Sequence, residues 1–539
     1  MSGKTFFTTI AAAALLSLQA LYGQESGQGK YNLPYKNTYN KEPLVTENEF
    51  RTEKPHTLKP ISFQEAKKKL PSPVWAGHTS EVEMYWKAWE IAWGNIRQPE
   101  EGSGFVSPYL DIAYNGNIFM WDMSFMMMFA HYGNQVFPFV NSMDNFYSHQ
   151  HPDGFICREI HADGSDCFER YDPVSTGPNL LPMAETKFFR QYGDVDRLHK
   201  VFSALCAYNK WLQLNRTWPD GSYWSSGWGT GMDNLPRVKS NYNPIYSHGH
   251  MTWLDTCLQQ WMVDKMLLDI GFYIERWQEI EDFEDEMKHL KQYINDNMWD
   301  EETGFLYDRY ADGTLCPTKS IAAFWALQTD VLEKDRLDRL VAHLNDTTEF
   351  AREHMVPSLS ADHPKYNEKG RYWQGGVWPG ANYMVMDGLY KKGYKDMAYK
   401  VASNDYANIL QIFKNTGTFW EYCAPESAEP GFMARDKFVG WGGLPPIAEF
   451  IEFILGIHSD CAEGTVTWEM QQTEEHGINN LPFKDGQLSL VAAARQDKSQ
   501  TPVITVTSNV EFDLIVNWGE GKTSGKVHVM PGKKQTVKI

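Results

Sequence analysis

Three segments of the chain combine glycines, tryptophans and carboxylates in a way that suits acid–base chemistry. They are residues 225–237 (SSGWGTGMDNLPR), 371–383 (RYWQGGVWPGANY) and 417–426 (GTFWEYCAPE). Glycine lets backbone approach a ligand closely, and an indole ring offers a flat apolar face with a polar edge. Two carboxylates in an aromatic cleft are what glycoside hydrolysis requires. The combination favours an enzyme that processes sugars.

The first segment places a carboxylate, Asp233, after three closely spaced glycines and close to Trp228. Loss of water around a carboxyl group raises its pKa and keeps it protonated near neutral pH. Asp233 is therefore a candidate general acid. The same side chain could instead cap a helix or pair with Arg237, and the sequence leaves both interpretations open.

The third segment contains Glu421, which stands between Trp420 and Tyr422. An ionised glutamate in such a setting can activate water as a general base. A surface glutamate at a helix end is the alternative, although the flanking aromatic residues disfavour a fully solvated position. Glu426 is a second candidate for the same role, and the sequence does not exclude it. Trp228 and Trp420, beside the two candidate carboxylates, are candidates for contact with a sugar.

Helical periodicity dominates the chain from residue 80 onward. Trp86, Trp89 and Trp93 recur at helical spacing, and Ser80 with Glu83 predicts a capping box at the start of that helix. Further helices are predicted at 122–132, 134–149, 180–192, 196–213, 250–269, 272–298, 318–329, 333–345, 377–391, 394–414 and 443–457. Twelve helices in successive hairpins predict a mainly α fold, an (α/α)6 toroid in which inner and outer helices alternate. The irregular helical solenoid is disfavoured because no self-similar repeat is visible.

Four regions are predicted along the chain: a signal peptide at 1–23, an extended segment at 24–72, the toroid at 73–459 and a β domain at 460–539. Alternating apolar residues and turns such as Asp485-Gly486 predict a small sandwich for the last region. It could bind carbohydrate, but an appendage that stabilises the toroid is the favoured interpretation.

The N-terminus predicts export. A single lysine precedes an apolar stretch from Phe6 to Leu21, and cleavage is expected near Gly23. The stretch contains polar residues and is short for a membrane span, so a periplasmic or secreted protein without a membrane anchor is expected. Seven cysteines leave at least one unpaired, and Cys157 and Cys167 could form a disulfide in an oxidising compartment.

Composition excludes several other functions. The net charge of −19 argues against a nucleic-acid partner, because phosphate binding needs a basic surface. The pair His248 and His250 lacks a third ligand at a zinc-site spacing. No metal and no cofactor is expected, and the sequence does not determine an oligomeric state.

Together, the three segments resemble the active-site motifs of glycoside hydrolase family 63 and the related trehalases. The resemblance includes Trp121-Asp122 and Gly154-Phe155-Ile156 and spans roughly residues 110–455. These families are inverting α-glycosidases built on an (α/α)6 domain. By that resemblance Asp233 corresponds to the general acid and Glu421 to the general base. It also implies a sugar-binding subsite formed by Trp121, Asp122, Arg237, Trp373, Gln374, Trp378 and Asn382.

One departure concerns specificity. The families often carry an Asn-Pro-x-Thr-Gly type run after the base, whereas this chain has Cys-Ala-Pro-Glu-Ser at 423–427. The substrate therefore cannot be carried over from the resemblance. The leading hypothesis is an exported inverting α-glycosidase that acts on an oligosaccharide or a glycan end. The alternatives are a carbohydrate-binding protein on a hydrolase scaffold and a polysaccharide lyase or epimerase on the same toroid.

Overall fold

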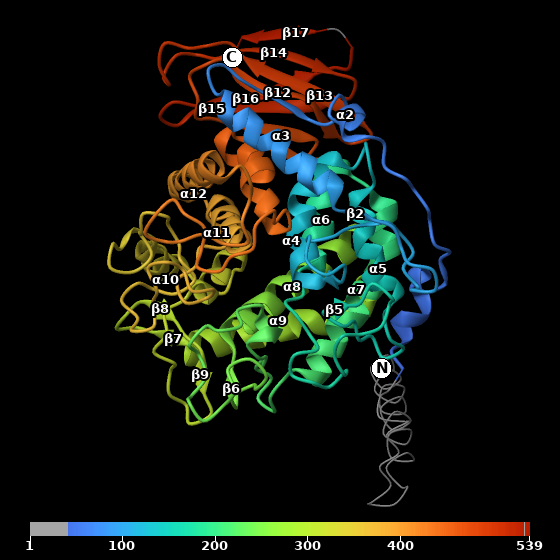
Figure 1. Cartoon of the computed structure of the whole chain (residues 1–539), viewed down its shortest axis with the longest axis vertical. Coiled ribbons are helices and arrows are strands. Elements are labelled where there is room, and N and C mark those ends of the chain that lie inside the picture. Colours follow the sequence, from blue (N-terminus) through green and yellow to red (C-terminus); the bar gives the residue numbers. More distant parts are fainter. Residues whose placement is uncertain (1–40, 533, 539) are drawn as a thin grey trace, which may run out of the picture. The chain divides into compact units, whose positions relative to one another are not determined.

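Helices follow one another around a ring in the order of the sequence (Figure 1). The computed structural model describes residues 41–532 and 534–538, so the predicted signal peptide lies outside the described residues. The chain divides into two units, residues 1–42 and 43–539, and the helices and strands named below belong to the second. No helix among the described residues is long and apolar enough to cross a membrane.

Within the described residues, six inner helices form a closed cycle. They are α4 (Met120–Ala130), α6 (Leu181–Tyr192), α8 (Leu254–Tyr273), the 3-10 helix η8 (Ile321–Gln328), α11 (Pro379–Lys391) and the π-helix η11 (Leu444–Ile454). Each contacts the next, and η11 returns to α4. Every residue of α4 and of η11 is buried. Helices that are buried on all sides belong to a core rather than to a surface.

Outer helices alternate with the inner ones along the chain. They are α3 (Thr79–Gly94), α5 (Asp144–Ser148), α7 (Val195–Asn215), α9 (Glu281–Asn297), α10 (Lys334–Ala342) and α12 (Lys395–Thr416). In α10 the buried side chains are Leu337, Leu340 and Val341, three and four residues apart, which is the spacing of one helical face. The alternation of buried and one-sided helices confirms the predicted (α/α)6 toroid.

Two predicted helices, 272–298 and 134–149, are shorter than expected. The first begins only at Glu281, because α8 continues to Tyr273 and a 3-10 turn follows at Trp277–Ile280. The second is prevented from starting at residue 134 by a proline. The structure has a 3-10 helix at Phe139–Met143 followed by α5, and Pro138 stands immediately before them. Proline has no backbone N–H and disfavours a helical conformation in the residue before it. A helix therefore cannot run through this position.

The predicted capping box at Ser80 is wrong. Helix α3 begins at Thr79 after His78, and no side chain caps its first turn. A capping box occurs instead at Ser62 and Glu65, where it starts the short helix α2 (Phe63–Ala66). Part of the segment predicted to be extended is thus helical, because this pair satisfies backbone N–H groups that the helix start would leave unpaired.

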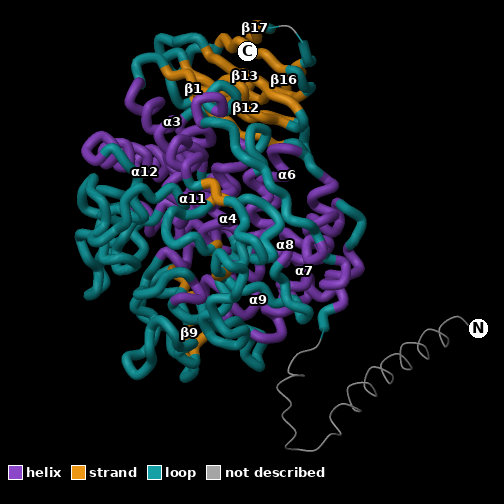
Figure 2. The backbone as a smooth tube through the Cα atoms, turned by 45° about the vertical axis from the view of Figure 1, so that its right-hand side comes forward, coloured by secondary structure: helices purple, strands orange, loops and turns teal. Residues whose placement is uncertain are grey.

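Two sheets form the C-terminal sandwich, which confirms the predicted fold class (Figure 2). The five-stranded sheet contains β1 (Ser72–Trp75), β12 (His476–Phe483), β13 (Gly486–Ala492), β14 (Val503–Ser508) and β17 (Gln535–Lys538). The four-stranded sheet contains β10 (Ile457–Asp460), β11 (Thr465–Met470), β15 (Phe512–Trp518) and β16 (Lys522–Val529). Strand β1 comes from the N-terminal side and pairs antiparallel with β12. The sandwich is therefore completed by residues that precede the toroid.

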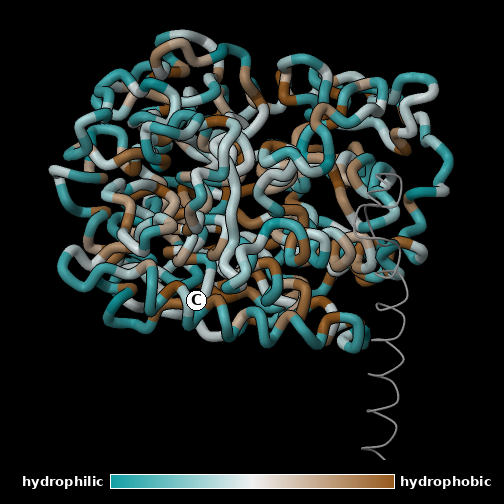
Figure 3. The backbone as a smooth tube through the Cα atoms, turned by 90° about the horizontal axis from the view of Figure 1, so that it is seen from below, coloured by the Kyte–Doolittle hydropathy of each residue, from teal (hydrophilic) through white to brown (hydrophobic). Residues whose placement is uncertain are grey.

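A continuous core joins the sandwich to the ring. Trp468 on β11 is fully buried, and its indole N–H donates to the Leu455 carbonyl, directly after η11, at 2.8 Å. Strand β10 contacts η11 and β12 contacts α6. In Figure 3 the outer loops are mostly hydrophilic, and hydrophobic stretches lie further inside. These contacts show that the sheets pack on the ends of the inner helices.

Candidate active site

A pocket of about 280 Å³ lies where several inner helices begin, and it is called the rim pocket here. Its walls include Tyr114, Phe119, Trp121, Asp122, Arg158, Glu159, Trp228, Gly231, Asp233, Tyr372, Glu421, Arg435, Phe438 and Trp441. Asp233, Tyr372 and Glu421 come from the first, second and third sequence segments respectively. The ring thus brings into one pocket three segments that are nearly 200 residues apart at the extremes.

The backbone around Gly231 positions Asp233. Gly231 has a φ of 72°, and a Cβ at this position would lie 3.3 Å from the Trp121 indole. Glycine therefore lets the loop turn tightly against the ring. Burial raises the pKa of Asp233 to about 6, the Arg158 charge and a hydrogen bond from Tyr372 oppose this rise, and the Glu421 charge adds to it. A carboxyl group of this kind holds a proton that it can give to a leaving group.

Backbone hydrogen bonds fix Glu421 after the end of α12. Its N–H donates to the Arg435 carbonyl at 3.0 Å, and its own carbonyl accepts from the Trp441 indole at 2.7 Å. Burial raises the pKa of Glu421, and the charge of Arg435, whose Nε lies 3.7 Å from Glu421 Oε2, lowers it. Arg435 therefore favours the ionised form, which a general base requires.

A third carboxyl group, Asp122, lies in the first turn of α4. Burial raises its pKa well above the usual range, and the nearby charge of Glu421 raises it further. A protonated carboxyl group donates a hydrogen bond as well as accepting one. The short strand pair β4 (Ile118–Phe119) and β5 (Glu159–Ile160) brings Arg158 and Glu159 beside Asp122 in the same wall.

Aromatic rings form much of the remaining wall. Trp121 is 8% exposed and packs edge-on against Phe125. The Arg158 guanidinium lies 5.4 Å from the Trp228 ring. At the mouth, the guanidinium of Arg435 stacks 3.7 Å from the ring of Tyr114, which is 54% exposed. Flat rings with charged neighbours suit the apolar faces and hydroxyl groups of a sugar.

Trp373, Gln374 and Trp378 support the pocket from behind and are absent from its walls. The two indoles stack with centroids 4.0 Å apart, and Trp378 also stacks on Tyr422. The Trp373 backbone N–H donates to the Asn234 side chain at 2.8 Å, and the Gln374 amide donates to the Asn234 carbonyl at 3.1 Å. Since Asn234 follows Asp233, the second segment holds the loop that carries the candidate acid.

Asn382 and Trp420, also predicted to contact the sugar, lie outside the rim pocket walls. Asn382 is fully buried, and its amide donates to the Asp405 carboxylate at 2.9 Å. The Trp420 indole donates to the Thr416 hydroxyl at 3.2 Å, at the end of α12. Both side chains therefore donate hydrogen bonds to partners within the protein.

Arg237 likewise does not reach the rim pocket. It is 1% exposed and forms two hydrogen bonds to Asp255, at 2.9 and 2.7 Å, and two to Asp308, at 2.7 and 2.6 Å. Its guanidinium also lies 4.4 Å from the Trp253 ring. These two carboxylates saturate the cation, so Asp233 is not its partner. The sequence did not reveal them because both lie in other segments.

Glu426, the rival of Glu421, is engaged elsewhere. Arg352 Nε donates to one of its oxygens at 2.6 Å and Nη2 to the other at 3.0 Å, and the Tyr366 hydroxyl donates at 2.7 Å. Burial would raise its pKa, but these hydrogen bonds outweigh burial and the pKa is lowered. Glu426 is not among the residues that line the rim pocket.

Several residues of the rim pocket were missed by the sequence analysis. Tyr372 stands inside the second segment, beside a tryptophan that was selected. Arg435 and Trp441 lie in the glycine-rich stretch 431–443, which follows the third segment and was a usable signal. Arg158 and Tyr114 carry no distinctive pattern, and only the folded chain brings them to the pocket.

The cysteine pair and the histidine pair are parts of the packed structure. All seven cysteines are free, so the disulfide considered between Cys157 and Cys167 is not formed. Burial raises the pKa of the Cys157 thiol to about 11, as expected for a buried, unreactive thiol. The rings of His248 and His250 lie 4.6 Å apart and pack on Trp218. Within the described residues, no group of three or more His, Cys, Asp or Glu side chains could hold a metal ion.

A comparison with protein families matches residues 117–438, more than half of the chain, to the mannosylglycerate hydrolase MGH1-like glycoside hydrolase domain. The chain belongs to this family. The match confirms the resemblance to glycoside hydrolase family 63, and it identifies the chain as a glycoside hydrolase that acts on a carbohydrate. The matched region contains every charged side chain named in the rim pocket walls.

Individual relatives agree with this assignment. A mannosylglycerate hydrolase of Thermus thermophilus is 30% identical over 129 residues, which is 24% of this chain and 29% of that protein. The structure of a family 63 mannosylglycerate hydrolase from Thermus thermophilus in complex with glucose has a TM-score of 0.54 at 17% identity, covering 67% of this chain and 99% of that one. Neutral trehalase Nth1 of Saccharomyces cerevisiae has a TM-score of 0.50 at 13% identity, over 64% and 74% of the two chains. At these identities the structures support the fold alone.

Proposed function

We propose that this glycoside hydrolase is an exported inverting α-glycosidase that acts on an oligosaccharide or a glycan end. The observation that carries the proposal is the pair Asp233 and Glu421, which line the same pocket with different partners. Asp233 has a pKa of about 6, raised mainly by burial. Burial also raises the pKa of Glu421, and the adjacent Arg435 charge opposes that rise and favours the ionised carboxylate. One group is thus suited to give a proton and the other to take one.

The mechanism is a single displacement. Glu421 takes a proton from water, and the water oxygen forms a bond to the anomeric carbon. The bond from that carbon to the leaving oxygen breaks, and Asp233 gives its proton to that oxygen. Attack from the face opposite the leaving group inverts the anomeric centre. Trp121 and Trp228 hold the ring by its apolar faces, and Asp122 and Arg158 bind its hydroxyl groups, which fixes the geometry of attack.

The mouth of the rim pocket carries positive charge. Arg435 is 42% exposed at its side chain and stands at the mouth with Tyr114. Since relatives are named mannosylglycerate hydrolases, an α-mannoside with a carboxylate in its aglycone belongs in the substrate panel beside neutral α-linked disaccharides. A guanidinium would pair with that carboxylate.

The decisive experiment follows the first product of an α-linked substrate by proton NMR before mutarotation. The β-anomer is expected, whereas an initial α-anomer requires a covalent intermediate and would overturn the single displacement. The panel combines α-linked disaccharides, aryl α-glycosides and mannosylglycerate. Binding of the panel without turnover of any member would contradict the proposed α-glycosidase activity.

Export is part of the proposal and rests on the N-terminal apolar segment of the sequence. The mature protein is expected to begin near Gln24 and to accumulate outside the cytoplasm. Mass spectrometry of the protein from the cell exterior or periplasm tests this expectation. An exported protein that retains Met1 would contradict it.

A further inference from the structure

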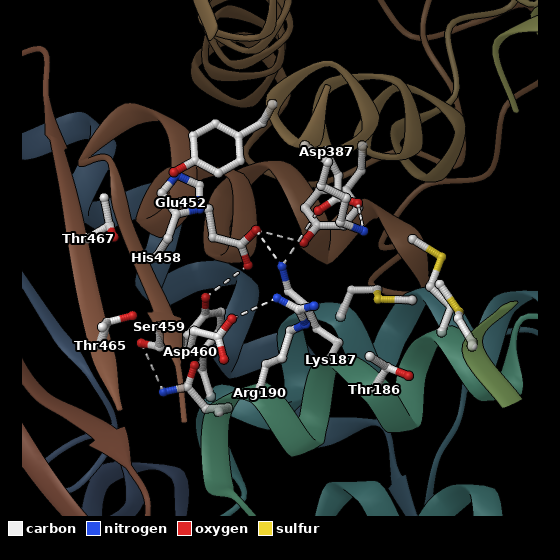
Figure 4. A pocket seen from close by; sticks show the side chains of 18 residues that line it. Thr186, Lys187, Arg190, Asp387, Glu452, His458, Ser459, Asp460, Thr465 and Thr467 are labelled. Atoms are coloured by element: carbon white, nitrogen blue, oxygen red, sulfur yellow. Dashed lines mark hydrogen bonds and ion pairs between the residues drawn. The ribbon is translucent and has the colours of Figure 1, made fainter. Parts of the chain in front are cut away.

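A second cavity lies between later turns of the inner helices and the C-terminal sheet, and it is called the distal cavity here (Figure 4). Its volume is about 230 Å³, against about 280 Å³ for the rim pocket. Helix α4 carries Asp122 of the rim pocket in its first turn and Met128 of the distal cavity near its end. Helix η11 begins shortly after Trp441 of the rim pocket and places Glu452 in the distal cavity. The two cavities are therefore separate sites joined by the same helices.

The charged groups of the distal cavity are paired with one another. The Lys187 amine lies 2.8 Å from Glu452, which also accepts hydrogen bonds from Tyr132 at 2.9 Å and Tyr383 at 2.7 Å. At the same cavity Asp387 pairs with the Lys391 amine at 2.6 Å. Because each charge has a partner inside the wall, the wall is neutral while it remains rich in donors and acceptors.

A third pair lies at the strand side, where Arg190 contacts Asp460 at 2.7 Å. Thr465 and Thr467 of β11 add two hydroxyl groups to this side, and Figure 4 shows them across from Lys187 and Arg190 of α6. Three ion pairs and two strand hydroxyls thus surround the space from two directions.

One further polar group of this wall lacks a partner. The Thr186 hydroxyl oxygen is buried and has no hydrogen-bond partner. The His458 ring also lines the cavity and stacks on Tyr390 with centroids 4.1 Å apart. Burial lowers the pKa of His458 to about 4. Its neutral ring offers one donor and one acceptor. Buried polar groups without partners are costly, and a bound ligand can satisfy them.

We propose that the distal cavity binds a neutral polyhydroxylated ligand of the size of one monosaccharide. Hydroxyl groups donate and accept, which matches a wall of amines, carboxylates, hydroxyls and a neutral imidazole. A free anion would compete with Glu452, Asp387 and Asp460 for their cations. A wholly apolar ligand would displace the water around these polar groups without replacing its hydrogen bonds. The volume is below the range of about 300–1,000 Å³ for drug-sized ligands and close to that of the rim pocket.

Titration of the mature full-length protein with D-glucose and D-mannose, followed by calorimetry and ligand-observed NMR, tests this site. Trp121→Ala weakens the rim pocket, and Thr467→Phe fills the distal cavity. Thr505→Phe on β14 is the matched control, because Thr505 is equally half-buried on a strand of the other sheet and lines neither cavity. Binding of at least one sugar should persist in Trp121→Ala. In that background it should weaken at least tenfold when Thr467→Phe is added and remain unchanged when Thr505→Phe is added.

A second variant guards against misfolding of Thr467→Phe. Thr186→Val keeps the shape of the side chain and removes the unpartnered hydroxyl, and it should weaken binding severalfold. Loss of all sugar binding in Trp121→Ala, or full binding in both distal variants, would overturn the proposal. So would binding of inorganic phosphate without binding of either sugar. Hydrolysis is assayed separately, so failure of the distal site and failure of the proposed glycosidase activity are distinguished.

Discussion

The rim pocket and the distal cavity bury carboxyl groups to a similar extent but leave them in opposite states. In the rim pocket, burial raises the pKa of Asp233 to about 6 and that of Asp122 well above its usual range. In the distal cavity, burial acts in the same direction on Asp387, but the charges of Lys391 and Lys187 outweigh it and lower the pKa to about 2. The supply of counter-charges, rather than burial itself, decides whether a carboxyl group can exchange a proton near neutral pH.

The same contrast occurs within one sequence segment. Asp233 and Arg237 are four residues apart. Arg237 is saturated by two carboxylates, whereas Asp233 stays in the pocket with a raised pKa. Perturbed and incompletely paired groups are typical of active sites, where stability is given up for chemistry. We therefore expect the paired charges to contribute to the stability of the fold. The carboxyl groups of the rim pocket, which lack such counter-charges, are expected to contribute to turnover.

The largest expected effect tests the turnover side of this comparison. Asp233→Asn and Glu421→Gln should each reduce kcat by about 10²–10⁴-fold, the range for general acid–base catalysis. Steady-state kinetics on the best substrate of the panel measures the loss. Glu426→Gln is the matched control, since its carboxylate is held by Arg352 outside the pocket, and it should have a much smaller effect. An essential Glu426 with a dispensable Glu421 would mean that the wrong glutamate has been assigned.

The stability side is tested by removing a paired charge. Arg237→Gln should reduce the free energy of unfolding by about 3–5 kcal/mol, because it leaves Asp255 and Asp308 buried without their cation. Urea denaturation measures the change. Arg339→Gln, which breaks an exposed pair with Glu301, should cost less than about 1 kcal/mol. If the Arg237 variant raises KM without lowering the free energy of unfolding, Arg237 binds the sugar instead of stabilising the fold.

Removing the charge of Asp233 should increase the free energy of unfolding, whereas removing that of Arg237 should reduce it. Its pKa is raised from 3.8 to about 6 in the folded protein, so the unfolded chain loses the proton first. The destabilisation that the buried Asp233 carboxyl causes is absent below pH 3.8. It grows as the pH rises toward 6, and it is complete above pH 6. Asp233→Asn should therefore increase the free energy of unfolding at pH 7 by up to about 3 kcal/mol and have little effect at pH 4. Equal effects at both pH values would contradict the raised pKa.

The smallest expected effect concerns the pH profile. Activity requires ionised Glu421 and protonated Asp233, so kcat/KM should decline above pH about 6, the pKa of Asp233. Arg435→Gln removes the charge that lowers the pKa of Glu421 and should move the acid limb to higher pH. Lys414→Gln removes an exposed cation outside the pocket walls and should leave the profile unchanged. If the acid limb of the kcat/KM profile has the same midpoint in Arg435→Gln as in the unchanged protein, Arg435 does not lower the pKa of Glu421.

Local patterns in the sequence predicted most of the helices. The helical period identified α6, α7, α11 and α12 to within two or three residues of their ends, because amphipathic helices repeat their apolar positions locally. The helix predicted at 134–149 begins only at Phe139, because Pro138 prevents the apolar pattern before it from continuing as the same helix. The edge strand β1 was missed because its partner β12 lies some 400 residues away.

The sequence by itself determined the helical ring, the C-terminal strands and the two candidate carboxylates, since periodicity and motif residues are local properties of the chain. Only the tertiary structure decided which side chains surround those carboxylates. Arg158 and Arg435 reach the rim pocket from distant loops, while Arg237 is drawn away by Asp255 and Asp308. The pKa of a buried group depends on every charge within a few ångströms, and folding sets those distances between residues far apart in the sequence.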